Sequence, residues 1–143
     1  MADEEAKPAI PKTYDWVSAL ATCSFDKQFD ALLEVIEFDV NAANLLGTSG
    51  GRLSFYHDPA KAQKVIVSCD RVVAFDKVIF ELATGAIVVT SRDSAGKETK
   101  RFSAKPTFNV QGECLLNVEG EDLRIWQVSR KALEDLFFGF SSE

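Results

Sequence analysis

The hydrophobic period of this chain changes at Arg52, and this change constrains the fold more than any other feature. From Arg52 onward, short runs rich in Val, Ile, Phe and Thr alternate between apolar and polar residues, which is the pattern of β-strands. Turn signals such as Thr84-Gly85 and Gln111-Gly112 separate the runs. Parallel strands need crossovers of about a dozen residues, so these short connections predict antiparallel hairpins. Seven to nine strands are predicted, from runs at 52–57, 64–69, 71–75, 77–83, 86–92, 99–104, 107–110, 113–118 and 123–128.

Helical spacing marks the chain on both sides of the strands. Segments 13–23 and 25–46 precede them, and the second begins after Ser24, a favourable N-cap, and ends at Gly47, a favourable C-cap. Val35 and Phe38 lie off its apolar stripe, so residues 37–40 either continue the helix or form a strand. After the strands, Ser129 is predicted to cap a last helix. The apolar stripe of the long helix comprises Phe25, Phe29, Leu32, Leu33 and Ile36, and that of the last helix comprises Leu133, Leu136, Phe137 and Phe140.

These elements predict an α+β fold in which an antiparallel β meander packs with N-terminal helices and a C-terminal helix. The sheet is expected to curl around the helices or to close into a partial barrel. In its order of elements the chain resembles pleckstrin-homology-like barrels, a likeness of layout alone. Residues 1–12 are polar, acidic and interrupted by Pro8 and Pro11, which predicts a flexible tail before a single domain at 13–143.

Charge and cysteine content exclude several classes of protein. The net charge of −6 argues against a nucleic-acid binder and against a polybasic membrane-surface protein. The first residues lack the apolar core of a signal peptide, and no 18-residue apolar run exists to span a membrane. Cys23, Cys69 and Cys114 are far apart and are accompanied by one histidine, so no metal site or cofactor is expected. We therefore expect three free thiols and a cytoplasmic location.

The only histidine, His57, lies in the run 52–57, and Cys69 ends the run 64–69. If the two runs pair as a hairpin, matching their apolar faces places His57 opposite Val65 and Leu53 opposite Cys69. Cys69 then lies four residues along the strand from His57, roughly 13 Å away at about 3.3 Å per residue. This distance is too long for a thiol–imidazole pair. We expect no catalytic site here and a His57 ring that is partly buried and hydrogen-bonded.

The C-terminal run LEDLFFGF concentrates phenylalanine near a chain end. A small domain has difficulty burying Phe137, Phe138 and Phe140 together, and exposed apolar clusters usually mark contact surfaces. The sequence thus predicts a non-enzymatic protein-interaction module, such as an adaptor, an inhibitor or a chaperone-like accessory protein of viral or immunity type. We expect it to bind another protein and to form a homodimer, with these three residues at the interface.

Two other functions remain open. A barrel that binds a small apolar ligand between the sheet and the long helix would use inward polar groups such as Tyr56, His57 and Arg124. An enzyme would use Cys69, or a carboxylate whose pKa is raised by burial.

Overall fold

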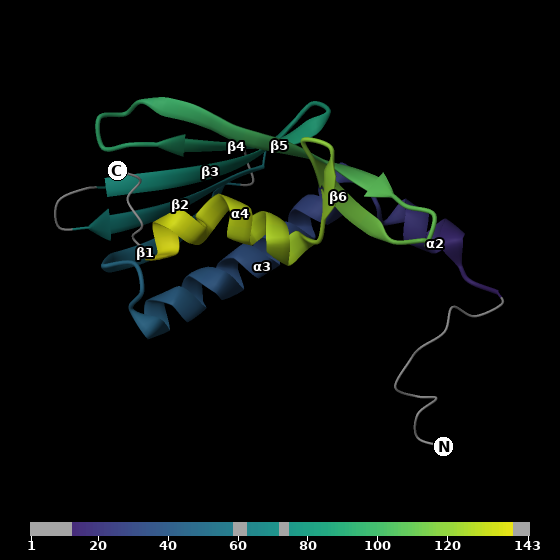
Figure 1. The fold of residues 1–143 in the computed structure, drawn as a ribbon, viewed down its shortest axis with the longest axis horizontal. Coiled ribbons are helices and arrows are strands. Elements are labelled where there is room, and N and C mark those ends of the chain that lie inside the picture. The colour runs from purple at the N-terminus through teal and green to yellow at the C-terminus, as the bar shows by residue number, and fades with distance from the viewer. Residues whose placement is uncertain (1–12, 59–62, 72–74, 139–143) are drawn as a thin grey trace, which may run out of the picture.

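The sheet is an antiparallel meander of seven strands, as the sequence predicts. A computed structural model describes residues 13–58, 63–71 and 75–138 (Figure 1). The strands lie in chain order across the sheet, and each pairs antiparallel with the next. The predicted runs at 99–104 and 107–110 belong to one strand. The strands are β1 (Gly51–Asp58), β2 (Lys64–Arg71), β3 (Phe75–Ala83), β4 (Ala86–Arg92), β5 (Glu98–Phe108), β6 (Cys114–Val118) and β7 (Glu121–Leu123).

The prediction of a curled sheet or partial barrel is wrong, because the sheet is open. Strands β1 and β7 form its opposite edges and do not pair with each other. Helices α3 (Phe25–Leu46) and α4 (Ile125–Phe138) lie side by side on one face of the sheet (Figure 1). Each helix is about 10 Å wide with its side chains, so the pair is too broad for the interior of a small barrel. The likeness to pleckstrin-homology-like barrels does not extend to closure.

Helix α3 follows the sequence prediction at both ends. The Ser24 side chain accepts a hydrogen bond from the backbone N–H of Lys27 at 3.3 Å, and Gly47 ends the helix in the left-handed conformation with φ of 67°. The helix is unbroken through residues 37–40, which settles the open alternative. Its core-facing stripe is Phe29, Leu32, Leu33, Ile36, Val40 and Ala43.

The core lies between this stripe, the inner face of α4 and one face of the sheet. Alternation along each strand sends every second side chain inward, which is why the central strands contribute pairs such as Val65 and Val67. Buried residues from the sheet include Leu53, Val65, Val67, Cys69, Val78, Phe80, Ile87, Val89, Phe102, Ala104, Leu116 and Val118. The buried apolar residues of α4 are Val128, Ala132, Leu133, Leu136 and Phe137.

Helix α4 begins earlier than predicted. The run 123–128 was expected to be a strand and Ser129 a helix cap, but the helix starts at Ile125 and Ser129 is buried within it. The Gln127 side chain accepts a hydrogen bond from the backbone N–H of Arg124 at 2.8 Å, as in a capping box. This contact fixes the start of the helix directly after β7.

The short helix α2 (Trp16–Ala21) has no buried residue. Asp15 caps it, and the pKa of the Asp15 carboxyl lies below its ordinary value because the side chain and backbone N–H of Ser18 donate to it. The Tyr14 hydroxyl donates to the carbonyl of Gly112 at 2.6 Å. Gly112 has φ of 83°, and a Cβ there would lie 2.7 Å from the Tyr14 ring, so this turn requires glycine.

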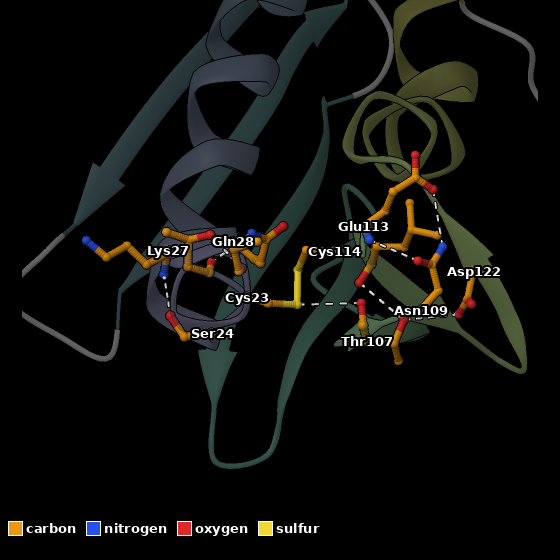
Figure 2. The surroundings of a disulfide bond; sticks show 12 residues. Cys23, Ser24, Lys27, Gln28, Thr107, Asn109, Glu113, Cys114 and Asp122 are labelled. Carbon is orange, nitrogen blue, oxygen red and sulfur yellow. Dashed lines mark hydrogen bonds between the residues drawn. A yellow bond between two sulfur atoms is a disulfide. The ribbon is translucent and has the colours of Figure 1, made fainter. Parts of the chain in front are cut away.

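A disulfide joins Cys23 to Cys114 across 91 residues of sequence (Figure 2). Cys23 precedes α3 and Cys114 begins β6, and the Sγ of Cys23 lies 3.5 Å from the carbonyl oxygen of Thr107. The prediction of three free thiols is therefore wrong, and Cys69 is the one free, buried cysteine. Disulfides form and persist in oxidising compartments, which argues against the predicted cytoplasmic location. No helix within the described ranges has the length and apolar character needed to cross a membrane.

Candidate functional site

The register of β1 and β2 confirms the sequence prediction for His57 and Cys69. Leu53 pairs with Cys69, Phe55 with Val67 and His57 with Val65. His57 and Cys69 are therefore separated along the hairpin and form no catalytic pair. Cys69 is fully buried and His57 partly so. The expected hydrogen bond at His57 is missing for Nε2, which is buried without a hydrogen-bond partner in the part of the chain that the structure describes.

The three residues predicted as ligand contacts do not converge. Tyr56 and His57 lie on β1 at one edge of the sheet, and their side chains point to opposite faces. Arg124 follows β7 at the other edge, where its guanidinium lies 3.6 Å from the Glu113 carboxylate. A site that uses all three side chains together has no basis in this arrangement.

The phenylalanines predicted at an interface have different environments. Phe137 packs into the core and is 7% exposed, whereas Phe138 is 51% exposed at the end of α4. Phe140 lies outside the described residues. Phe137 and Phe138 both line a groove between α3 and α4.

This groove, which we call the α3–α4 groove, has a volume of about 470 Å³ and a mainly apolar lining. From α3 and the turn after it, the lining includes Asp39, Ala42, Ala43, Leu46 and Thr48, and from α4 it includes Trp126, Ser129, Arg130, Leu133, Glu134, Phe137 and Phe138.

Small side chains create the hollow. Helix α3 presents Ala42 and Ala43 at the point where α4 presents Leu133 and Phe137. Because the alanine side chains stop at Cβ, they fill little of the space between the two helices. Leu133 and Phe137 are nearly fully buried and form the floor, while the exposed ring of Trp126 contributes to a wall.

Polar contacts hold the walls in place. The Ser129 hydroxyl donates to Asp39 Oδ2 at 2.7 Å and links the two helices. At the C-terminal end, the Thr48 hydroxyl donates to the carbonyl of Phe137 at 2.7 Å. These two contacts link the two sides of the groove at separate points.

Exposed apolar side chains line the groove and continue from it over the outer side of α3. Leu46 and Trp126 line it with exposed fractions of 76% and 54%, and Phe138 adds a third large exposed side chain. Phe38 and Leu45 lie four residues before and three after Ala42 on the outer side of α3, and both are more than two-thirds exposed. Together these five side chains offer roughly 600 Å² of apolar surface, taking about 200 Å² for a fully exposed aromatic side chain.

Sequence reasoning found only the α4 end of this surface. The α3 side was missed because the apolar stripe predicted for the long helix ends at Ile36 and includes neither Leu45 nor Leu46. Phe38, lying off the core stripe, was the available signal: residues 38, 42, 45 and 46 form a second apolar face. Trp126 was missed because its run was predicted to be a strand.

No cluster of three or more His, Cys, Asp or Glu side chains suited to a metal ion occurs in residues 13–58, 63–71 and 75–138. Comparison of the chain with protein-family models, with curated proteins and with solved structures finds no significant match.

Proposed function

We propose that this protein is a non-enzymatic binding module that receives an apolar, helical segment of another protein in the α3–α4 groove. The observation that carries the proposal is a groove lined by the exposed side chains of Leu46, Trp126 and Phe138, with Phe38 and Leu45 extending the exposed apolar surface over the outer side of α3. Exposed apolar patches of several hundred Å² on a monomer are often functional. A standard interface buries about 800 Å² per partner, and the roughly 600 Å² offered here approaches that value.

The concave shape favours a different protein over a second copy at this surface. In a symmetric dimer the same patch meets itself, so the hollow above Ala42 and Ala43 would face another hollow. A ridge of apolar side chains on a helix fills such a groove, with anchors spaced three and four residues apart. The sequence also predicts a homodimer through the C-terminal phenylalanines. The experiments described below distinguish that dimer from a complex with a different protein.

The Cys23–Cys114 disulfide supports an oxidising setting for this function. In such a setting the bond fastens the start of α3 to β6, at the opposite end of α3 from Leu46. The helix that forms one wall is thereby anchored at its far end.

The test is affinity capture from extracts of the cells that produce the protein. Three immobilised baits are compared: the wild type, a Leu46→Glu/Phe138→Glu variant, and a Val110→Glu control. Val110 is 97% exposed on the β5–β6 turn and does not line the groove, so the control adds a charge to an exposed apolar site elsewhere. We expect one protein to be retained by the wild type and the control but lost by the double variant.

Retention of the same proteins by all three baits would contradict the proposal. Sedimentation velocity on the same variants detects a dimer at this surface. If the wild type is dimeric and only the double variant is monomeric, the groove is a self-association surface and the proposed hetero-partner is wrong.

A small apolar ligand is the second candidate, because the groove volume lies within the range of about 300–1,000 Å³ that is usual for ligand pockets. Native mass spectrometry of the freshly purified protein separates the two functions. A retained mass of a few hundred daltons that the double variant lacks would favour the ligand.

A further inference from the structure

The backbone of β1 has a free edge. Among the described strands, β1 is the first of the sheet and pairs with β2 alone. In an antiparallel pair, successive residues direct their N–H and C=O groups alternately toward the neighbour and away from it. The Leu53 N–H donates to Asn44 Oδ1 at 2.9 Å, and the Leu53 carbonyl accepts from Asn44 Nδ2 at 2.9 Å. The polar groups of Leu53 thus face away from β2, and those of Phe55 and His57 share this direction.

Side chains cap the first half of this edge and leave the second half open. The Ser49 hydroxyl donates to the Gly51 carbonyl at 2.7 Å, and Asn44 covers Leu53 as described. In the described residues, no hydrogen bond joins the outward groups of Phe55 or His57 to another part of the chain. Helix α3 begins next to the disulfide that ties Cys23 to β6, and near its C-terminal end it reaches the β1 edge through Asn44, which bonds to Leu53.

We propose that a second copy of this chain pairs with the open half of β1, antiparallel and about a two-fold axis at Tyr56. Phe55 of one copy then lies opposite His57 of the other, and each such pair exchanges two N–H···O hydrogen bonds. The two-fold axis generates the second pair, so all the outward groups of both residues are satisfied. The two sheets become one continuous sheet with both helix pairs on the same face.

The side chains of β1 are compatible with this pairing. Tyr56, which is 58% exposed on the face away from the helices, meets Tyr56 of the second copy as a cross-strand aromatic pair. Ser54 lies opposite Asp58 of the second copy, so no like charges face each other. The pairing ends at residue 54, one residue before the Asn44 cap. A longer foreign strand would run into that cap, whereas the symmetric pairing stops short of it.

Cysteine cross-linking tests the register. In the pairing, the two Tyr56 residues form a non-hydrogen-bonded pair with Cα atoms about 4.5 Å apart, which is within disulfide range. Ser54 is the matched control: it is exposed on the same face of the same strand, but its symmetry mate lies about 13 Å away at 3.3 Å per residue. With oxidised glutathione, Tyr56→Cys should become a covalent dimer on non-reducing gels, and Ser54→Cys should stay monomeric.

The wild type provides a second measurement. Sedimentation velocity at graded concentrations should show a reversible dimer. Tyr56→Lys, which places two lysines opposite each other, should raise its dissociation constant by about tenfold, equivalent to about 1.4 kcal/mol. Tyr56→Phe should leave it unchanged. Because Tyr56 is exposed, both variants are expected to fold, and circular dichroism checks this.

Equal cross-linking of Tyr56→Cys and Ser54→Cys, no cross-linking of Tyr56→Cys, or a monomeric wild type at all concentrations would overturn the proposal. The β1 edge shares no residue with the α3–α4 groove, so these results leave the proposed function untouched. The Leu46→Glu/Phe138→Glu variant should dimerise like the wild type.

Discussion

Asn44 shows how one side chain can govern the behaviour of a sheet edge. Its amide imitates a neighbouring strand, because it satisfies both the N–H and the C=O of Leu53. Unprotected edges invite pairing with other chains, and natural proteins usually cover or charge them. Here side chains of the same chain satisfy the outward backbone groups of β1 only as far as Leu53. Pairing with another chain is therefore limited to the residues of β1 that follow Leu53.

Asn44→Ala should lower the free energy of unfolding by about 1–3 kcal/mol, because it leaves two backbone groups of Leu53 without partners. Asn41→Ala is the matched control: Asn41 is exposed on the same helix, so this change should be within about 0.5 kcal/mol of the wild type. Urea unfolding of the three proteins measures both effects. Equal stabilities of the two variants would show that the Asn44 contacts do not stabilise the fold.

For individual residues, the sequence predicted the β1–β2 register in detail but did not predict the missing hydrogen bond at His57. The β1–β2 register, with His57 opposite Val65, followed from matching two alternating apolar faces. The missing hydrogen bond at His57 Nε2 was not predictable, because it depends on which side chains surround the ring. Alternation gives the direction of a side chain but not its neighbours.

The helix pair is the element that carries the proposed function. Helix α3 has two apolar faces: one packs on the sheet and the other, around Phe38 and Leu46, remains exposed. A helix that only covered a sheet would have a polar outer side. Packing on the sheet therefore does not explain the second apolar face of α3.

Ala42→Phe should fill the groove and abolish partner capture without unfolding the protein. The new ring would lie over Leu133 and Phe137, within the α3–α4 groove. Ala31→Phe is the control, because Ala31 lies on the same helix but does not line the groove. We expect capture to be lost for Ala42→Phe alone, with both unfolding free energies within about 1 kcal/mol of the wild type. Normal capture by Ala42→Phe would place the partner elsewhere.

Element boundaries were predictable where capping residues are unambiguous. Ser24 and Gly47 set the limits of α3 and were read correctly. The start of α4 was misplaced because Ile125, Trp126 and Val128 favour strands locally. The period of burial in α4, at residues 128, 129, 132, 133, 136 and 137, is helical, so packing against the core overrides this preference.

At the scale of the whole molecule, the disulfide links the two ends of the fold. Cys23 precedes the helix layer, Cys114 belongs to the second half of the sheet, and 91 residues separate them. Sequence spacing alone did not reveal this pair, because nothing local brings the two cysteines together. The sequence also did not predict that the sheet is open. Closure depends on whether β1 pairs with β7, and short-range sequence patterns do not determine this.

Removal of the disulfide should destabilise the protein considerably. Closing a loop of this length restricts the unfolded chain, so Cys23→Ser/Cys114→Ser should lose about 4–5 kcal/mol of unfolding free energy in the chain-entropy description. Guanidinium unfolding with and without dithiothreitol measures this, and the reductant should have no effect on the double variant. Thiol titration of the unfolded, unreduced wild type should detect Cys69 alone. Detection of all three cysteines would contradict the bond.

The central claim, that the α3–α4 groove binds a protein segment, is tested most directly by the accessibility of Trp126. In a Trp16→Phe variant Trp126 is the only tryptophan, and its 54% exposed ring should be quenched efficiently by iodide. Addition of the purified captured partner should lower the quenching constant of Trp126 as the ring becomes covered. A bound partner that leaves this quenching constant unchanged would contradict the account.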